Sequence, residues 1–214
     1  MTYIVRRVRG RGSPDPAKGE AAVLSHWRPE GSDHRPPVTA RLIHDGARLL
    51  GRFEVADRYV RAVATEYGGR VWEDSCVEFF FQPVPGKGHF AFEFSCGGVF
   101  LANYVTDPAR VPGGFKAWRP LSLKEVSAVR VRSLYKAPIA REIALPTAWW
   151  LEYEIPVSAL EPFVGKLGPL KGQRWRGNFT KCADACSHPH WGSWAPLSRK
   201  EFHAPAEFEE LVFE

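Results

Sequence analysis

Hydrophobic and polar residues alternate in short runs along much of the chain. In the clearest run, residues 76–81, Val77, Phe79 and Phe81 point to one side and Glu78 points to the other. A period of two with β-branched and aromatic residues is typical of a strand that packs on at least one face. This run therefore predicts a strand with a core face and a face that carries a carboxylate.

The same alternation recurs along the chain. In residues 89–94, Phe90, Phe92 and Phe94 face inward and Glu93 faces outward. Asp45-Gly46 predicts a hairpin turn between two runs, and 156–160 can start a short helix. The Pro- and Gly-containing segment 106–120 is expected to be a loop. Strands are expected at 38–44, 48–55, 76–81, 89–94, 99–104, 126–135, 139–145, 149–155, 174–181 and 208–213.

About ten short strands with almost no helix indicate one fold class. The 18 Pro and 19 Gly residues favour many turns. We expect an all-β, antiparallel β-sandwich, jelly-roll-like, with long loops and at most one or two short helices. No shift in composition marks a boundary, so 1–214 is interpreted as a single domain. Within it, residues 1–20 are expected to be partly tail and partly an edge strand that includes Tyr3 and Val5.

The charge is mild. The formal net charge of +5 among 214 residues fits a protein that is merely well solvated. Arg6, Arg7, Arg9 and Arg11 alternate with Val and Gly, which favours an edge strand and its turn over a nucleic-acid arm. No run approaches the length of a membrane span. We expect no nucleic-acid or membrane partner, and the lack of a visible signal peptide makes a cytoplasmic location the default. The four Cys residues are expected to be free thiols, and the oligomeric state stays open.

Aromatic residues give the first indication of function. They make up 13% of the chain, with eight Trp, and Trp72 stands just before the strand that carries Glu78. A flat ring can cover the apolar face of a sugar, and a carboxylate can accept hydrogen bonds from its hydroxyls. The alternative is structural: Trp72 covers the end of the core and Glu78 is solvated.

Five motifs occur in an order that resembles a known family: Val-Trp-Glu-Asp-Ser-Cys-Val-Glu-Phe-Phe-Phe (71–81), Phe-Glu-Phe-Ser (92–95), Glu-Ile-Pro-Val-Ser-Ala-Leu (154–160), Trp-Arg-Gly-Asn-Phe-Thr-Lys-Cys (175–182) and His-Pro-His-Trp-Gly-Ser-Trp (188–194). Over roughly 38–213 the chain resembles the family-nine-like carbohydrate-binding modules, relatives of the xylan- and cellulose-binding module of certain xylanases. The resemblance implies a β-sandwich that clamps a mono- or oligosaccharide between two aromatic side chains. It implies no cofactor, although such modules can hold structural calcium.

The resemblance also implies a set of ligand-binding residues. The first aromatic falls at Trp72, the glutamate at Glu78, and the polar positions of a later strand at Asn178 and Lys181. The second aromatic belongs to the loop before the final strand, where residues 199–206 contain no Trp. The nearest substitutes are Phe202 and His203, with Trp191 and Trp194 as alternatives.

Other functions stay open beside non-catalytic sugar binding. One is a sandwich that has lost sugar binding and serves protein interaction. Another is a glycosidase, which needs two carboxyl groups on either side of the scissile bond. A metal site is a third, because Cys and His gather near 182–190, and a haem site is a fourth, although the only Met is Met1. The candidate carboxyl groups of a glycosidase are Glu78, Glu93, Glu152 and Glu154. The candidate metal ligands are Cys182, Cys186, His188 and His190.

Overall fold

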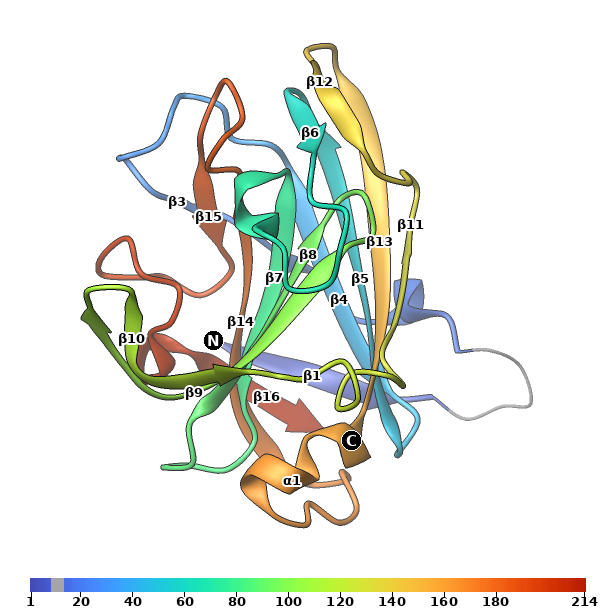
Figure 1. Cartoon of the computed structure of the whole chain (residues 1–214). Helices are drawn as coiled ribbons and strands as arrows, with labels where there is room; N and C mark the ends of the chain where they lie inside the picture. Colours follow the sequence, from blue (N-terminus) through green and yellow to red (C-terminus); the bar gives the residue numbers. More distant parts are fainter. Residues whose placement is uncertain (9–13) are drawn as a thin grey trace.

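The computed structural model describes residues 1–8 and 14–214 (Figure 1). Strands prevail, with one α-helix of four residues and four short 3-10 turns in this part of the chain. The strands are β1 (Thr2–Arg7), β2 (Ala22–Val23), β3 (His26–Trp27), β4 (Val38–His44), β5 (Arg48–Asp57), β6 (Val60–Ala62), β7 (Cys76–Gln82), β8 (His89–Ser95), β9 (Phe100–Val111), β10 (Gly114–Pro120), β11 (Arg130–Ser133), β12 (Ile139–Ile143), β13 (Thr147–Pro156), β14 (Arg174–Cys182), β15 (Trp191–Ser193) and β16 (Glu209–Phe213). The helical elements are η1 (Pro16–Lys18), η2 (Val71–Glu73), η3 (Val157–Ala159), α1 (Glu161–Val164) and η4 (Pro205–Glu207).

Two sheets pack face to face, which confirms the predicted β-sandwich. The first sheet has the order β10-β9-β8-β7-β14-β16-β1, and the second continues β1-β4-β5-β13-β11. The pairs β7–β8, β8–β9 and β4–β5 are antiparallel, as the alternating runs and the Asp45-Gly46 turn predict.

Strand β1 joins the sheets and is not the edge strand that we predicted. Its residues Thr2–Val5 pair with β16 of the first sheet, and Arg6 and Arg7 pair with β4 of the second. Both pairings are parallel, so the sandwich is not purely antiparallel. A strand that crosses from one sheet to the other closes a corner of the sandwich. Arg9 and Arg11, which we expected in this strand or the turn after it, lie outside the described residues.

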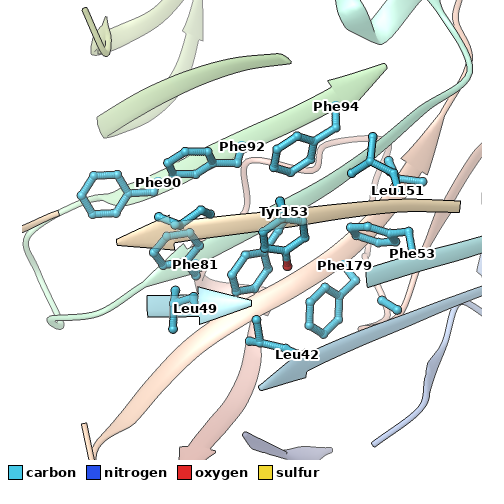
Figure 2. Close-up of a cluster of buried hydrophobic side chains, with 14 of the residues drawn as sticks. Leu42, Leu49, Phe53, Phe81, Phe90, Phe92, Phe94, Leu151, Tyr153 and Phe179 are labelled. Atoms are coloured by element: carbon cyan, nitrogen blue, oxygen red, sulfur yellow. The ribbon is translucent and has the colours of Figure 1, made fainter. Parts of the chain in front are cut away.

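The core lies between the two sheets (Figure 2). Phe90, Phe92 and Phe94 follow one another along β8, and the ring of Tyr153 from the opposite sheet stacks on Phe94 with centroids 4.9 Å apart. The inward faces predicted by the period of two are therefore confirmed. The buried inward residues of the predicted strands are Val77, Phe79, Phe81, Phe90, Phe92, Phe94, Trp149, Leu151, Tyr153, Ile155, Trp175 and Phe179.

The predicted loop 106–120 is instead a hairpin of β9 and β10. The ladder has Arg110 opposite Phe115 and Asp107 opposite Ala117, so two residues of β9 oppose one of β10. Pro108 falls in this bulge, where a missing N–H costs no ladder hydrogen bond. Figure 1 shows the hairpin projecting to the left, beside the red-orange loop that precedes β16.

No helix in the described residues has the length and apolar character needed to cross a membrane.

Candidate sugar-binding site

A cavity of about 580 Å³ opens on the outer face of β7, β8 and β9. Its walls come from the segment around Trp72, the β9–β10 hairpin, and the loop 200–203 before β16. Both the volume and the mixture of apolar and polar lining groups fit a small-molecule site, which typically measures about 300–1,000 Å³. The outward face of β7 is therefore covered and hollow, and it is not an open wet face.

Two carboxyl groups form the floor of the cavity. Glu78 and Glu93 are direct neighbours across β7 and β8, and their residues are only 3% and 6% exposed. Burial is the main cause that raises the pKa of Glu78, to about 7. Burial, followed by the charge of Glu78, raises the pKa of Glu93 well above its usual range. Two neighbouring carboxylates repel each other, so this arrangement favours a state in which at least one carboxyl group holds a proton or accepts a hydrogen bond from a ligand.

The two carboxyl groups differ in their partners. Thr180 donates its hydroxyl to Glu78 Oε2, and the Cys182 thiol lies 3.4 Å from Glu78 Oε1. Glu93 accepts no hydrogen bond from any residue that the structure describes, and its nearest basic group is His203, with Nε2 3.8 Å from Oε1. Glu93 thus presents free acceptor capacity to the cavity.

Several aromatic rings surround this floor. Trp72, Trp191 and Phe202 pack around the same small apolar cluster and line the cavity. The Lys200 ammonium lies 2.9 Å from the centroid of Trp191, so it covers one face of that ring. Asp184 accepts from Trp191 Nε1 at 2.7 Å, which fixes the indole against the wall.

The hairpin forms the opposite wall and is held to the loop before β16. Arg110 donates to both oxygens of Glu201, at 2.6 and 2.9 Å. Its guanidinium lies 4.1 Å from the centroid of Phe115, and that ring lies 4.3 Å from the His203 ring. Trp118 also lines the cavity and is 43% exposed. The wall therefore offers further rings at the mouth of the cavity.

Four of the predicted ligand-binding residues are brought together, and three are not. Trp72, Glu78, Phe202 and His203 line the cavity, as does the alternative aromatic Trp191. Asn178 is fully buried, and its Oδ1 accepts from the backbone N–H of Ala195 at 2.8 Å, so it anchors the loop. Trp194 packs against Tyr3 and Phe179 in the core.

Lys181 lies on the opposite face of β14 from the cavity, which corrects its predicted place in the site. Thr180 faces Glu78, so the next residue must point inward. Its ammonium is fully buried and donates to the carbonyl of Cys182 and to His190 Nε2, each at 2.9 Å. It also lies 3.9 Å from Asp57 Oδ2.

The Cys and His residues that were considered as an alternative metal site do not converge. Cys182 faces Glu78, Cys186 lies 3.7 Å from the Ser75 hydroxyl, and His188 stacks on Tyr59 at 3.7 Å. His190 binds Lys181 instead. The spacing along the chain places these four groups around a loop without a common centre.

Two other clusters of described side chains could hold a cation. One is His34, Asp57 and His190, and the other is Cys76, Glu78 and Cys182. Neither offers the all-oxygen ligand set that Ca²⁺ prefers, so neither fits the structural calcium that such modules can hold. In the first cluster the Lys181 ammonium already supplies the positive charge.

Part of the lining was missed by sequence reasoning. Glu93 was identified only as a catalytic candidate, although the alternation in β8 puts it on the same face as Glu78. Arg110 and Trp118 were hidden in the supposed loop, and Asp184 in a turn that carries no periodic signal. Chain topology alone brings these residues to the cavity.

Comparison with known proteins finds a matching family model and structures with a similar fold. The family model described as carbohydrate-binding family 9 matches residues 17–213. The structure of a candidate carbohydrate-binding protein from Bacteroides uniformis is 32% identical, with a TM-score of 0.86, and the match covers 100% of this chain and 99% of that one.

Two more distant structures share the fold. They are of a carbohydrate-binding module of family 9 from Caldicellulosiruptor kristjanssonii, in complex with glucose (14% identity, covering 100% of this chain and 96% of that one) and with cellotriose (15% identity, covering 100% and 94%). Both have a TM-score of 0.61. No functionally curated protein matches the sequence.

Proposed function

Because the chain belongs to carbohydrate-binding family 9, we propose that it binds a sugar noncovalently in the cavity on β7, β8 and β9. The observation that carries this proposal is the unpartnered Glu93 carboxyl at the floor of a cavity walled by aromatic rings. Because this carboxyl faces the cavity without a donor from the described residues, it can accept hydrogen bonds from a ligand, and sugar hydroxyls are such donors.

We assign the stacking surface to Trp72. Its ring lies at the wall and is half-buried, and the Arg70 guanidinium lies over it, 5.7 Å from the centroid. One face of Trp191 is covered by Lys200, which leaves Trp118 on the hairpin as the candidate for the second ring. In this arrangement the sugar lies between rings from two different walls, and its hydroxyls reach Glu78 and Glu93 below.

Glycoside hydrolysis is the second candidate, and one observation favours it. Two buried carboxyls lie directly opposite one another, where Cβ atoms of paired strands are about 5 Å apart. A retaining glycosidase likewise uses two carboxyl groups close to one another, about 5–5.5 Å apart. Membership of a binding family favours binding alone, and a search for reducing-sugar products after long incubation separates the two.

Calorimetric titration with glucose, cellobiose, xylobiose and galactose tests the binding proposal. We expect saturable binding of at least one sugar, and Trp72→Ala should weaken it about tenfold or more, since a stacked ring contributes about 1.4 kcal/mol or more. Trp150→Ala is the matched control, because Trp150 lies on the second sheet beneath the Arg52 guanidinium. Circular dichroism confirms that each variant is folded.

The proposal fails if no sugar in the panel binds saturably to the wild-type protein. It also fails if Trp150→Ala weakens binding as much as Trp72→Ala does. If no sugar binds, the results favour the alternative function, in which the sandwich has lost sugar binding and binds a protein.

A further inference from the structure

We propose that Cys76, Cys182 and Glu78 form a zinc-binding site at the floor of the cavity, with the fourth position open to the cavity. The two cysteines are direct neighbours across β7 and β14. Glu78 follows Cys76 by two residues, so all three side chains leave the same face of the sheet. No sequence motif pointed to this set, because the two cysteines are more than a hundred residues apart.

The distances between the ligand atoms fit a tetrahedral ion. The two Sγ atoms and one Glu78 oxygen all lie within 4.8 Å of one another, and Cys182 Sγ lies 3.4 Å from Glu78 Oε1. Two sulfurs on one zinc ion are about 3.8 Å apart, given a Zn–S distance of about 2.3 Å. The site therefore needs about 1 Å of side-chain adjustment or less.

The chemistry of the ligands selects the metal. Two thiolates and one carboxylate suit a borderline-soft ion such as Zn²⁺ and do not suit Ca²⁺ or Mg²⁺. Three protein ligands leave one coordination position, as in zinc sites that hold water or a ligand. Because Glu78 and Cys182 line the cavity, that position faces the space into which a sugar hydroxyl or a water can enter.

One outer contact supports the site. Thr180 donates its hydroxyl to Glu78 Oε2, and such a contact orients a carboxylate ligand. Zinc is bound by thiolates, so its binding releases the protons of both thiols to the solvent.

The remaining cysteines provide matched controls. Cys96 Sγ lies 3.6 Å from the carbonyl of Arg61, and Cys186 Sγ lies 3.7 Å from the Ser75 hydroxyl. Both are buried thiols, and among the described residues neither belongs to a cluster of three ligand groups. A metal held nonspecifically by buried thiols would respond to these two residues as well.

The experiment is a titration of the reduced, metal-free full chain with Co²⁺ and then with Zn²⁺. We expect one equivalent of Co²⁺ to give a thiolate-to-cobalt charge-transfer band with tetrahedral d–d bands, and Zn²⁺ to displace it. Cys76→Ser and Cys182→Ser should each lower zinc affinity by about 100-fold or more, because loss of an outer partner alone lowers it about 10–100-fold. Cys96→Ser and Cys186→Ser should bind as the wild type does.

Folding and ligand identity are checked separately. Circular dichroism and thermal unfolding of the metal-free variants exclude misfolding, and Thr180→Val is a milder variant that should weaken zinc binding while keeping all three ligands. X-ray absorption should show two sulfur ligands at about 2.3 Å. The proposal is overturned if no charge-transfer band appears, if Cys182→Ser binds zinc as the wild type does, or if all four cysteine variants lose binding equally.

Discussion

Lys181 is the residue for which the resemblance and the structure make opposite predictions. The resemblance assigns it to the sugar site, whereas the structure buries its ammonium on the core side of β14. Its partners there are the Cys182 carbonyl, His190 Nε2 and the carboxylate of Asp57. We therefore predict that Lys181→Met damages the stability of the fold and leaves sugar binding nearly unchanged.

The size of the effect follows from the ion pair. Two unit charges about 4 Å apart attract by about 4 kcal/mol at an effective dielectric of 20, and Lys181 Nζ lies 3.9 Å from Asp57 Oδ2. Removal of one partner of a buried pair typically costs about 3–5 kcal/mol, because the other charge stays buried. Lys181→Met should lower the free energy of unfolding by that amount at pH 7. Asp57→Asn combined with Lys181→Met should cost less than the sum of the single variants.

The same pair has a pH signature. Burial by itself raises the pKa of Asp57, but the Lys181 charge and hydrogen bonds from His34 and Trp149 outweigh it and lower the pKa to about 2. A carboxylate with a depressed pKa contributes stability above its unfolded pKa of about 4, and this is lost as the pH falls toward 2. Between pH 4 and pH 2, protonation of Asp57 should lower the free energy of unfolding of the wild type by about 2 kcal/mol. The decrease should be smaller in Lys181→Met.

The assays are urea unfolding at pH 7 and at several values between pH 4 and 2, together with calorimetric sugar titration of the folded variant. The reasoning is refuted if Lys181→Met changes the free energy of unfolding by less than about 1 kcal/mol and abolishes sugar binding. That result would return Lys181 to the site.

Two further predictions concern the cavity itself. Burial raises the pKa of Glu78 to about 7. The contribution of this group to folding stability is therefore complete below its unfolded pKa and is lost as the pH rises through 7. In urea unfolding without metal, the free energy of unfolding of Glu78→Gln should therefore exceed that of the wild type by up to about 3 kcal/mol at pH 8 and by little at pH 4. An equal difference at both pH values would contradict a buried, protonated carboxyl group. Arg110→Lys keeps the charge but loses the two-bond contact with Glu201, so sugar affinity should fall severalfold in calorimetry. Arg132→Lys, on the second sheet, should have no effect, and an unchanged affinity in Arg110→Lys would show that the hairpin does not shape the site.

The core and the sheet order near the site could be predicted from the sequence because they depend on local rules. The period of two sets which residues of 76–81 and 89–94 face inward, and short turns make neighbouring runs pair. Trp72 and Glu78 were identified for the same reason, since they belong to one strand and its start.

The walls of the cavity could not be predicted in this way. Pro108 and Pro112 suggested a loop, because proline is disfavoured within a strand. Only the pairing of β9 with β10 shows that Pro108 occupies a bulge. Arg110 and Glu201 are 91 residues apart, and no local pattern pairs them. The assignment of Lys181 to the site has a different origin. The alternation within β14 places its side chain on the opposite face from Thr180, and the family pattern was preferred over that local rule.

The position of Lys181 also connects the core to the site. It stands between Thr180 and Cys182, the two residues whose side chains contact Glu78 from the other face of β14. Its charge therefore lies on the opposite face of the sheet from Glu78. From there it lowers the pKa of Glu78 and partly offsets the effect of burial, which raises it. A buried cation in the core thus favours negative charge at Glu78 and Cys76. Removal of Lys181 should consequently raise the pKa of Glu78 further, even though the lysine never contacts the cavity.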